Sequence, residues 1–433
     1  GDSFSIDVGR ENGTFSAENA TSGSRIVFSA PSTGGGGPPG GGGDPDDGGP
    51  TVDEDTTVGP DGEGQETTNI NPGDEPSTVE VAGEGGGPPS LSLGLPAGVG
   101  GTVEGKTQKQ SGQQARDDLL SRIGASGGDL EETQELQDKA QKFLDSLPEG
   151  SEVTITSITP SVEGDQAPDD PIEINGNEDP DSIESTVIDT RNLPSGTQLN
   201  INGVENVTFI GDVQASGGEG NNNASGDGGS QFIVLGPGDD TISGGGGADT
   251  VGSEGGADVI YGNAGTDRAT GGEGSDQVYG NQGVDEVYGN QGDDLVFGGQ
   301  DSDLVFGGQG NDLVLGGIGD DHVYGNFGND SLDGNAGDDL LKGGAGDDTL
   351  SGGAGDDTFH FDTASGQDTV RDFDGGDTVE IAAGLNGTGI QSFDDLAISD
   401  TDQGAEVDLG DGNTVLIEGV SASDLSSSDF SIV

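Results

Sequence analysis

Groups of three consecutive apolar residues recur in the second half of the chain, and each group is closed by glycines. Residues 294–317 read DLVFGGQDSDLVFGGQGNDLVLGG. A strand that is buried on one face needs an apolar residue only at alternate positions, so the central residue of a triplet is predicted to point inward and its two neighbours outward. Val296, Val305 and Val314 are therefore predicted core residues.

The first half of the chain shows a weaker pattern. Strand-like runs occur at residues 3–8 and 24–30, and short β-like runs between residues 151 and 213 predict an irregular β region. Apolar residues at helical spacing within residues 111–147 predict a small helical hairpin. Residues 216–230 are expected to form a loop rich in Gly and Asn.

Residues 31–90 are rich in Gly, Pro, Asp, Glu and Thr, and they include GGGGPPGGGG at residues 34–43. This composition is typical of a flexible acidic linker. The other interpretation is a segment that lies in extended conformation along a neighbouring subunit.

A strict nine-residue period runs from Leu235 to His360 without an insertion, which makes fourteen units. Most units have the form G-G-x-G-x-D-x-U-x, in which U is an apolar residue. Every unit has aspartate at its sixth position. The fourteen predicted metal ligands are Asp240, Asp249, Asp258, Asp267, Asp276, Asp285, Asp294, Asp303, Asp312, Asp321, Asp330, Asp339, Asp348 and Asp357.

The charge balance points to cations as partners. The chain has 83 acidic and 12 basic residues and a formal net charge of -71, so it would repel the phosphate backbone of a nucleic acid. Only 27% of its residues are hydrophobic, a proportion that at this net charge is typical of disorder. A folded form therefore needs a further source of stability, and bound divalent metal would both neutralise carboxylates and favour folding.

The units at residues 307–315, 343–351 and 352–360 read GGQGNDLVL, GGAGDDTLS and GGAGDDTFH. On these motifs the repeat segment resembles the RTX family of secreted calcium-binding β-roll proteins. The resemblance implies that unit n stacks on unit n+2 and that Ca²⁺ lies between stacked loops, at about twelve sites. The residue types agree, because glycine lets backbone carbonyl groups turn toward a cation and aspartate adds a hard, charged oxygen.

The units of Asp258, Asp267 and Asp303 depart from the pattern. The first lacks both leading glycines, the second has Ala269 at the inward apolar position, and the third has Asp301 in place of its fourth glycine. We expect the metal sites near these three aspartates to deviate most.

The resemblance continues beyond the repeats. Residues 360–381 are similar to the strand-rich cap that closes RTX rolls, and residues 392–433 are similar to the uncleaved signal that type I secretion systems read. This similarity implies a secreted protein that acts outside the cell or at the cell surface. The absence of cysteine excludes disulfides and thiolate metal sites.

Motifs for catalysis are scarce. The zinc-protease motif H-E-x-x-H is missing, and the two histidines, His322 and His360, occupy strand positions inside the repeats. G-x-S-x-G occurs once, around Ser126, but it lies between two predicted helices instead of after a strand, and no histidine outside the repeats could pair with it. We expect the protein not to be an enzyme.

The residues that flank the inward valines form an outward apolar band. Its members are Leu295, Phe297, Leu304, Phe306, Leu313 and Leu315. Like side chains that stack along a sheet stiffen it, whereas a large exposed apolar patch is typical of a contact surface. In the second case the N-terminal half or a neighbouring copy covers the band, and a strand at 3–8 or 24–30 is donated to the next subunit.

Two function classes remain. The first is a structural, self-assembling extracellular or cell-surface protein, such as a fibre, sheath or surface layer, in which calcium drives folding and assembly. The alternative is a calcium-stabilised adhesin or ligand-binding protein that uses residues 91–230.

The predicted fold class is dominated by β structure. It consists of a parallel β-roll solenoid of nonapeptide repeats with a C-terminal β cap, preceded by a Gly/Pro-rich linker, a small helical hairpin and an irregular β region. The expected segments are an N-terminal strand arm (1–30), the linker (31–90), a small α+β region (91–230), the β-roll (231–360) and the cap with the secretion signal (361–433).

Overall fold

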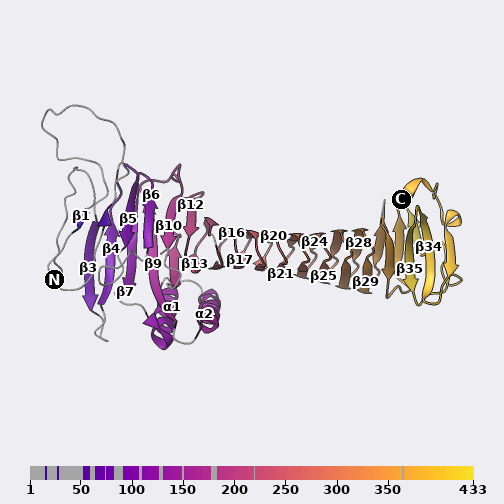
Figure 1. Ribbon diagram of the computed structural model, residues 1–433, viewed down its shortest axis with the longest axis horizontal. Coiled ribbons are helices and arrows are strands. Elements are labelled where there is room, and N and C mark those ends of the chain that lie inside the picture. The colour runs from indigo at the N-terminus through magenta and orange to yellow at the C-terminus, as the bar shows by residue number, and fades with distance from the viewer. Residues whose placement is uncertain are drawn as a thin grey trace, which may run out of the picture. The chain divides into compact units, whose positions relative to one another are not determined.

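A computed structural model shows that the chain consists mainly of β-strands and forms two compact units, residues 1–235 and 236–433 (Figure 1). The structure describes residues 15–16, 27–28, 52–58, 64–73, 75–81, 91–106, 110–125, 130–148, 151–176, 183–218, 220–362 and 365–433. The predicted strand at 3–8 and Ser126 lie outside these residues. None of the described helices is long and apolar enough to cross a membrane.

The first unit contains two sheets, and from β9 onward successive strands of the chain alternate between them. One sheet has the order β1 (Phe15–Ser16), β2 (Val27–Phe28), β5 (Ser77–Val81), β6 (Leu91–Leu95), β10 (Ile172–Gly176), β12 (Gln198–Asn202), β14 (Val213–Gly217) and β16 (Gln231–Pro237). The other has the order β3 (Val52–Val58), β4 (Gly64–Ile70), β7 (Val99–Lys106), β9 (Glu152–Val162), β11 (Ile183–Asp189), β13 (Asn206–Ile210) and β15 (Asn223–Ser225), and β8 (Gln110–Ser111) also pairs with β9.

Strand direction changes within each sheet of this unit. The pairs up to β7–β9 and β6–β10 are antiparallel, and the pairs from β9–β11 and β10–β12 onward are parallel. The expected irregular region at 151–213 is therefore a parallel solenoid with unequal turns. Its inward residues, such as Ile174 and Ile201, lie opposite each other in the ladder and are no more than 3% exposed.

The segment that we predicted to be a linker contains strands β3, β4 and β5. Val79 is fully buried, and it lies opposite both Leu93 and Phe28. Few apolar residues among Thr and Glu are enough in β3, β4 and β5, because each of these strands is paired with a neighbouring strand on at least one side. Val27 and Phe28, which lie in the predicted donated run, pair within their own chain.

The predicted helical hairpin is confirmed. Helix α1 (Gly112–Ala125) and helix α2 (Leu130–Ser146) pack on β9, β11 and β13. Their shared core consists of Ala115, Leu119, Ile123, Leu136, Ala140, Val153, Ile155, Val187 and Ile210. Arg122 anchors α1, because its Nη1 donates hydrogen bonds to the Glu104 carbonyl at 2.9 Å and to Ser157 Oγ at 3.0 Å.

The second unit begins with a regular two-sheet roll. The first sheet contains β17 (Thr241–Gly247), β19 (Val259–Gly265), β21 (Gln277–Gln282), β23 (Leu295–Gln300), β25 (Leu313–Ile318), β27 (Ser331–Ala336), β29 (Thr349–Ala354) and β31 (Gln367–Val370). The second contains β18 (Thr250–Gly255), β20 (Arg268–Glu273), β22 (Glu286–Gln291), β24 (Leu304–Gln309), β26 (His322–Phe327), β28 (Leu340–Ala345), β30 (Thr358–Phe361) and β32 (Thr378–Ile381). We call them the odd sheet and the even sheet. Up to β30, residue i pairs in parallel with residue i+18.

A single column of side chains per sheet fills the roll. The inward residues are Ile242, Val251, Ile260, Ala269, Val278, Val287, Val296, Val305, Val314, Val323, Leu332, Leu341, Leu350 and Phe359, and each is no more than 1% exposed. The predicted inward position of Val296, Val305 and Val314 is confirmed. The remaining two members of each triplet point outward, as expected.

The outward apolar band divides between opposite faces of the roll. Leu295, Phe297, Leu313 and Leu315 lie on the odd sheet, and the other two members lie on the even sheet. Aromatic residues at the ninth position of the units stack in ladders along each sheet. Ring centroids are 5.1 Å apart for Tyr261 and Tyr279, and 4.9 Å apart both for Tyr288 and Phe306 and for Phe306 and Tyr324.

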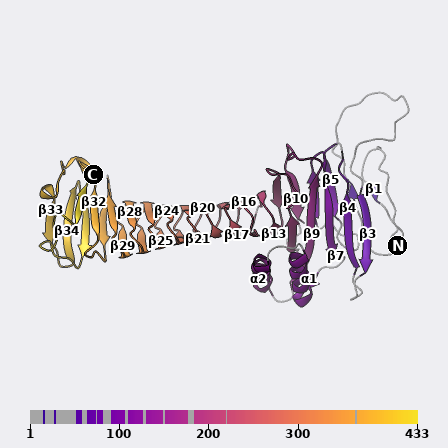
Figure 2. The ribbon, with the colours of Figure 1, turned by 180° about the vertical axis from the view of Figure 1, so that it is seen from behind.

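A cap closes the C-terminal end of the roll (Figures 1 and 2). On the odd sheet, β31 is followed by β35 (Asn413–Glu418), β34 (Gly404–Gly410) and β33 (Ala397–Asp400), of which the last two pairings are antiparallel. On the even sheet, β36 (Phe430–Ile432) pairs with β32. Two short 3₁₀ turns, Leu385–Gly387 and Phe393–Asp395, lie between β32 and β33 in the sequence.

Candidate metal centre

The fourteen predicted aspartates occupy equivalent places, each as the last residue of a turn and directly before a strand. Seven precede the strands of the odd sheet and seven those of the even sheet, so they form two rows along the roll. None of these side chains is more than 4% exposed. Burying an ionised carboxylate is unfavourable unless a cation or hydrogen bonds compensate for lost water, so each row needs such partners.

One oxygen of twelve of these carboxylates, from Asp258 to Asp357, is satisfied by the preceding turn of the same row. Oδ1 of Asp258 accepts a hydrogen bond from the backbone N–H of Asp240 at 2.7 Å, and the same bond recurs every eighteen residues. Twelve such bonds, between 2.7 and 2.9 Å long, continue to Asp357.

The other oxygen, Oδ2, is buried without a hydrogen-bond partner in eleven of these residues. They are Asp258, Asp267, Asp276, Asp285, Asp294, Asp303, Asp312, Asp321, Asp330, Asp339 and Asp348. In all of these units except that of Asp258, which begins with Ser253, Oδ2 faces a small space beside the first glycine of its own unit. A Cβ placed on Gly280, for example, would lie 2.6 Å from Asp285 Oδ2 and 2.6 Å from the Gly298 carbonyl oxygen. A carboxylate oxygen and a backbone carbonyl oxygen thus border the same space.

Burial raises the pKa of these carboxyl groups. Desolvation, partly offset by the backbone hydrogen bond, raises the pKa of Asp285 to about 6 and that of Asp339 to about 7. The pKa of Asp303 rises to about 8, because desolvation is reinforced by the charges of Asp285, Asp321 and Asp301. Without a cation, the rows are therefore under electrostatic strain at neutral pH.

These oxygens suit a hard divalent cation such as Ca²⁺, which takes six to eight oxygen ligands from carboxylates and backbone carbonyls. Among the described residues, no three His, Cys, Asp or Glu side chains converge on one point. A cation held here would therefore take one or two aspartate oxygens, and backbone carbonyls such as that of Gly298 would complete its shell. It would supply charge neutralisation and cross-links between turns.

The three units that we expected to deviate keep the same arrangement. The bond ladder passes through Asp258, Asp267 and Asp303 without a gap. In the unit that lacks leading glycines, Ser253 Oγ donates to the Gly236 carbonyl at 3.2 Å. Asp301 adopts φ of 72°, a conformation that aspartate tolerates better than most residues.

A second ladder runs through the fifth positions of the units. Here the side chain accepts from the turn that follows: the N–H of Asn311 donates to Asp293 Oδ1 at 2.8 Å, and the N–H of Asp356 donates to Asp338 Oδ1 at 2.8 Å. The ladder is solvent-exposed. From Asp293 onward, the turns are thus bonded to their neighbours in both directions.

Two residues that we did not predict continue the sixth-position rows into the cap. Oδ1 of Asp368 accepts from the Asp348 N–H at 3.0 Å, and Oδ1 of Asp377 accepts from the Asp357 N–H at 2.9 Å. These turns contain two extra residues, which hides them from a strict nine-residue period. The half-motif G-x-D-T-V, at residues 366–370 and 375–379, could have revealed them.

Two further units precede the predicted repeats, in the segment that we expected to be a loop. Residues 217–225 and 226–234 fit the period with amides at the sixth position, Asn222 and Gln231. Ala224 and Ile233 occupy the inward place and are fully buried. An amide lacks the charge of a carboxylate, so these turns offer weaker cation ligands.

The geometry defines a class of protein: a parallel β-solenoid in which each turn contributes buried carboxylate and carbonyl oxygens for divalent cations. Overlapping segments between residues 216 and 370 match the family model of the RTX calcium-binding nonapeptide repeat. This part of the chain consists of RTX repeats, and such repeats bind Ca²⁺ at multiple sites. The assignment of the individual aspartates as ligands is our proposal.

Comparisons with whole proteins add little. No curated protein matches this sequence. Among solved structures, the extracellular lipase LipA from Serratia marcescens is similar with 17% identity and a TM-score of 0.20, over 58% of this chain and 45% of the lipase. The chain thus spans less than half of that enzyme's length, and nothing about its own activity follows from a similarity this distant.

The raised pKa values predict that acid partly replaces calcium. The unfolded-state pKa is near 3.8 and the folded-state values are about 6 to 8, so the calcium-free roll binds more protons when folded. Its free energy of unfolding therefore falls as pH rises from about 4 to 8 and is constant above that range. Chelated protein at pH 5, above the pI of about 4.1, is expected to show more β structure by circular dichroism than at pH 8.

The control for this comparison is the same pair of spectra in millimolar calcium. Calcium binding requires ionised carboxylates, so the order of stability should then reverse or disappear. A chelated protein with more β structure at pH 8 than at pH 5 would contradict the assignment of the buried aspartates.

Proposed function

We propose that this protein is a secreted, calcium-dependent structural component that assembles with copies of itself outside the cell or at the cell surface. The calcium-binding repeats support secretion and calcium dependence, because RTX repeats are typical of secreted proteins. We also propose that it is not an enzyme. His360 Nδ1 lies 2.8 Å from Glu380 Oε1 and the His322 ring packs edge-on against Tyr324, so both histidines have structural contacts.

The observation that supports self-assembly is the outer face of the odd sheet. We call the group Leu295, Phe297, Leu313, Leu315 and Ile318 the odd-face patch. Leu295 lies beside Leu313 and Phe297 beside Leu315 on β23 and β25, and Ile318 lies at the end of β25 opposite Gln300. Leu313 is 44% exposed and Ile318 is 64% exposed. Apolar side chains that remain this exposed on a strand are typical of a contact surface.

The proposal rests on this face and not on a donated N-terminal strand. Val27 and Phe28 pair within their own chain, and the run at 3–8 lies outside the described residues. The adhesin alternative has weaker support. Outward amides of the first unit bond to neighbouring side chains: Asn200 Nδ2 donates to the Glu173 carboxylate at 2.9 Å, and Asn202 Nδ2 donates to Asn175 Oδ1 at 2.8 Å. A ligand could reach these two amides only after rearrangement.

Electron microscopy of the purified chain tests the proposal. With millimolar calcium we expect fibres or sheets that disperse when excess chelator is added. The variant Leu313→Gln/Ile318→Gln should remain calcium-bound and folded yet fail to assemble, because it replaces the two most exposed members of the odd-face patch. Val284→Gln is the matched control, since Val284 is 54% exposed but lies in a turn.

Dispersed particles of the native chain in both conditions would refute self-assembly and leave calcium-dependent folding intact. Equal assembly of the patch variant and the control would show that assembly uses another surface.

A further inference from the structure

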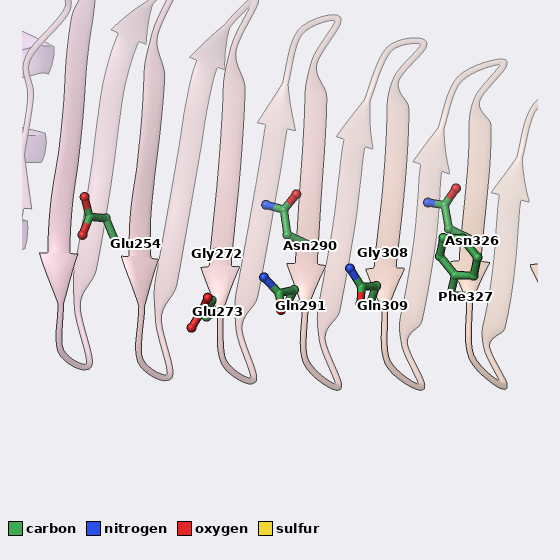
Figure 3. Close-up of a pocket in the computed structure, with 9 residues that line it drawn as sticks. All are labelled: Glu254, Gly272, Glu273, Asn290, Gln291, Gly308, Gln309, Asn326 and Phe327. Atoms are coloured by element: carbon green, nitrogen blue, oxygen red, sulfur yellow. The ribbon is translucent and has the colours of Figure 1, made fainter.

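The even sheet carries a groove that the calcium rows and the odd-face patch do not use (Figure 3). It has a volume of about 440 Å³ and crosses five strands, β18 to β26. Its lining includes Glu273, Asn290, Gln291, Gln309, Asn326 and Phe327. Five strands set about 4.8 Å apart give a length of about 19 Å along the roll.

The repeat register builds this groove from second and third positions. Gly308 lies between Asn290 and Asn326 in the ladder, and without a side chain it leaves a gap between the two amides. Gln309 lies between Gln291 and Phe327 in the next column. Figure 3 shows these side chains on successive strands, with Phe327 at one end of the row.

The amides of the groove are not consumed by the fold. Among the described residues, the side chains of Asn290 and Asn326 make no hydrogen bond. The strands that carry them are paired through their backbones. Two of the equivalent asparagines on the odd sheet bond internally, since Asn263 Nδ2 donates to Ser243 Oγ at 2.8 Å and Asn335 Nδ2 donates to the Asp333 carbonyl at 3.2 Å. Nδ2 of the third, Asn281, is buried without a hydrogen-bond partner. The even-sheet amides therefore remain available as donors and acceptors.

Charge and backbone pairing narrow the class of ligand. Glu254 and Glu273 lie at one end, and the chain carries a net charge of -71, so a polyanion would be repelled. A peptide could not add as a strand, because β20, β22 and β24 are already paired on both sides. The carboxamides of the groove can both donate and accept hydrogen bonds, and hydroxyl groups of a ligand can do the same, so the two match.

The exposed ring adds an apolar contact. Phe327 is 65% exposed, and the negative face of an aromatic ring attracts polarised C–H groups such as those on one side of a sugar ring. An elongated groove with free amides and one aromatic end thus suits a ligand that carries hydroxyls on its edges and C–H groups on its faces.

We propose that this groove binds an uncharged polysaccharide chain, laid along the axis of the roll across β18 to β26. Asn290, Gln291, Gln309 and Asn326 bond to its hydroxyl groups, and Phe327 packs on one sugar ring. This activity is separate from self-assembly, since it uses the opposite sheet, and it requires only the calcium-loaded roll.

Binding is tested with the full chain in millimolar calcium, by calorimetry and saturation-transfer NMR. The probes are neutral hexasaccharides (cello-, laminari- and chitohexaose), a hyaluronan fragment of similar length as the polyanion, and an uncharged Thr-rich peptide. At least one neutral hexasaccharide is expected to bind, whereas the hyaluronan fragment and the peptide are not.

Two variants locate the site. Asn290→Gly/Asn326→Gly removes both amides without strain, because other units have glycine at this position and glycine accepts the positive φ of Asn290, 81°. Phe327→Ser removes the ring. Each should weaken binding at least about tenfold, the effect of losing one or two good contacts. Circular dichroism in calcium should remain unchanged.

The odd sheet provides matched controls. Asn281→Gly makes the same change at the same φ of 81°, and Ile318→Ser removes an equally exposed side chain. Both should bind as the native chain does. The proposal is overturned if no neutral hexasaccharide binds, if the hyaluronan fragment or the peptide binds in its place, or if the controls lose as much affinity as the groove variants. Assembly of fibres is scored independently in the same samples.

Discussion

Removal of calcium at neutral pH is expected to unfold the repeat segment. The buried Oδ2 atoms have no hydrogen-bond partner, and the carboxyl groups have pKa values of about 6 to 8, so at pH 7.5 most of them carry uncompensated charge in the absence of a cation. The hydrophobic core cannot offset this cost, because each turn buries only two inward side chains. Excess chelator should abolish most of the β signal in circular dichroism and increase the hydrodynamic radius.

Calcium should restore both observables, and magnesium at the same concentration should not, because Mg²⁺ keeps its waters and demands a regular octahedral shell. Asp312→Asn keeps an oxygen for the N–H of Asp294 but removes one charge, and it should raise the calcium concentration at the folding midpoint. Asp402→Asn, a change at an exposed residue of the cap, should not. A chelated protein that remains compact and rich in β structure would contradict the predicted metal centre.

The variant Gly283→Ala is expected to disrupt the roll locally even when calcium is saturating. Gly283 has φ of 116°, which is strained for any residue with a Cβ, and an added Cβ would lie 1.4 Å from the Gly265 carbonyl oxygen. The clash is with backbone of the adjacent turn, so no side-chain rotation relieves it. We expect a loss on the order of 3 kcal/mol or more.

The measurement is thermal unfolding in millimolar calcium, together with the calcium midpoint of folding. Gly375→Ala is the matched control, because a Cβ at Gly375 meets no atom within 4 Å and its φ is not in the strained range. Equal melting temperatures for the two variants would show that the close approach of the turns is not required for stability.

The roll could be predicted from the sequence because its nine-residue period fixes the inward side chain and the buried aspartate of every unit together. When the same residue type returns every nine positions, one inward apolar residue and one buried aspartate per unit follow for all units, and Val305 and Asp303 illustrate both. The continuation through Asp368 and Asp377 could not be predicted in the same way, because two added residues per turn break the period while the hydrogen bonds persist.

The first unit was less predictable for a physical reason. Its solenoid turns have unequal lengths, so inward residues such as Ile174 and Ile201 recur without a fixed spacing. Strand β5 depends on partners distant in sequence, since Val79 lies opposite Leu93 and Phe28 in the sheet. Local patterning cannot show such pairings.

The two opposed ladders of the roll have a mechanical consequence. A turn of eighteen residues is bonded through Asp or Asn side chains only to the turn before it and the turn after it, as at Asp312 and Asn311. Under tension along the axis every interface carries the same load, but an end turn is held on one side only, so we expect turns to detach singly from an end. Each released turn adds about 60 Å of extended chain, so the segment can absorb a pull in discrete steps and, as calcium rebinds, wind up again.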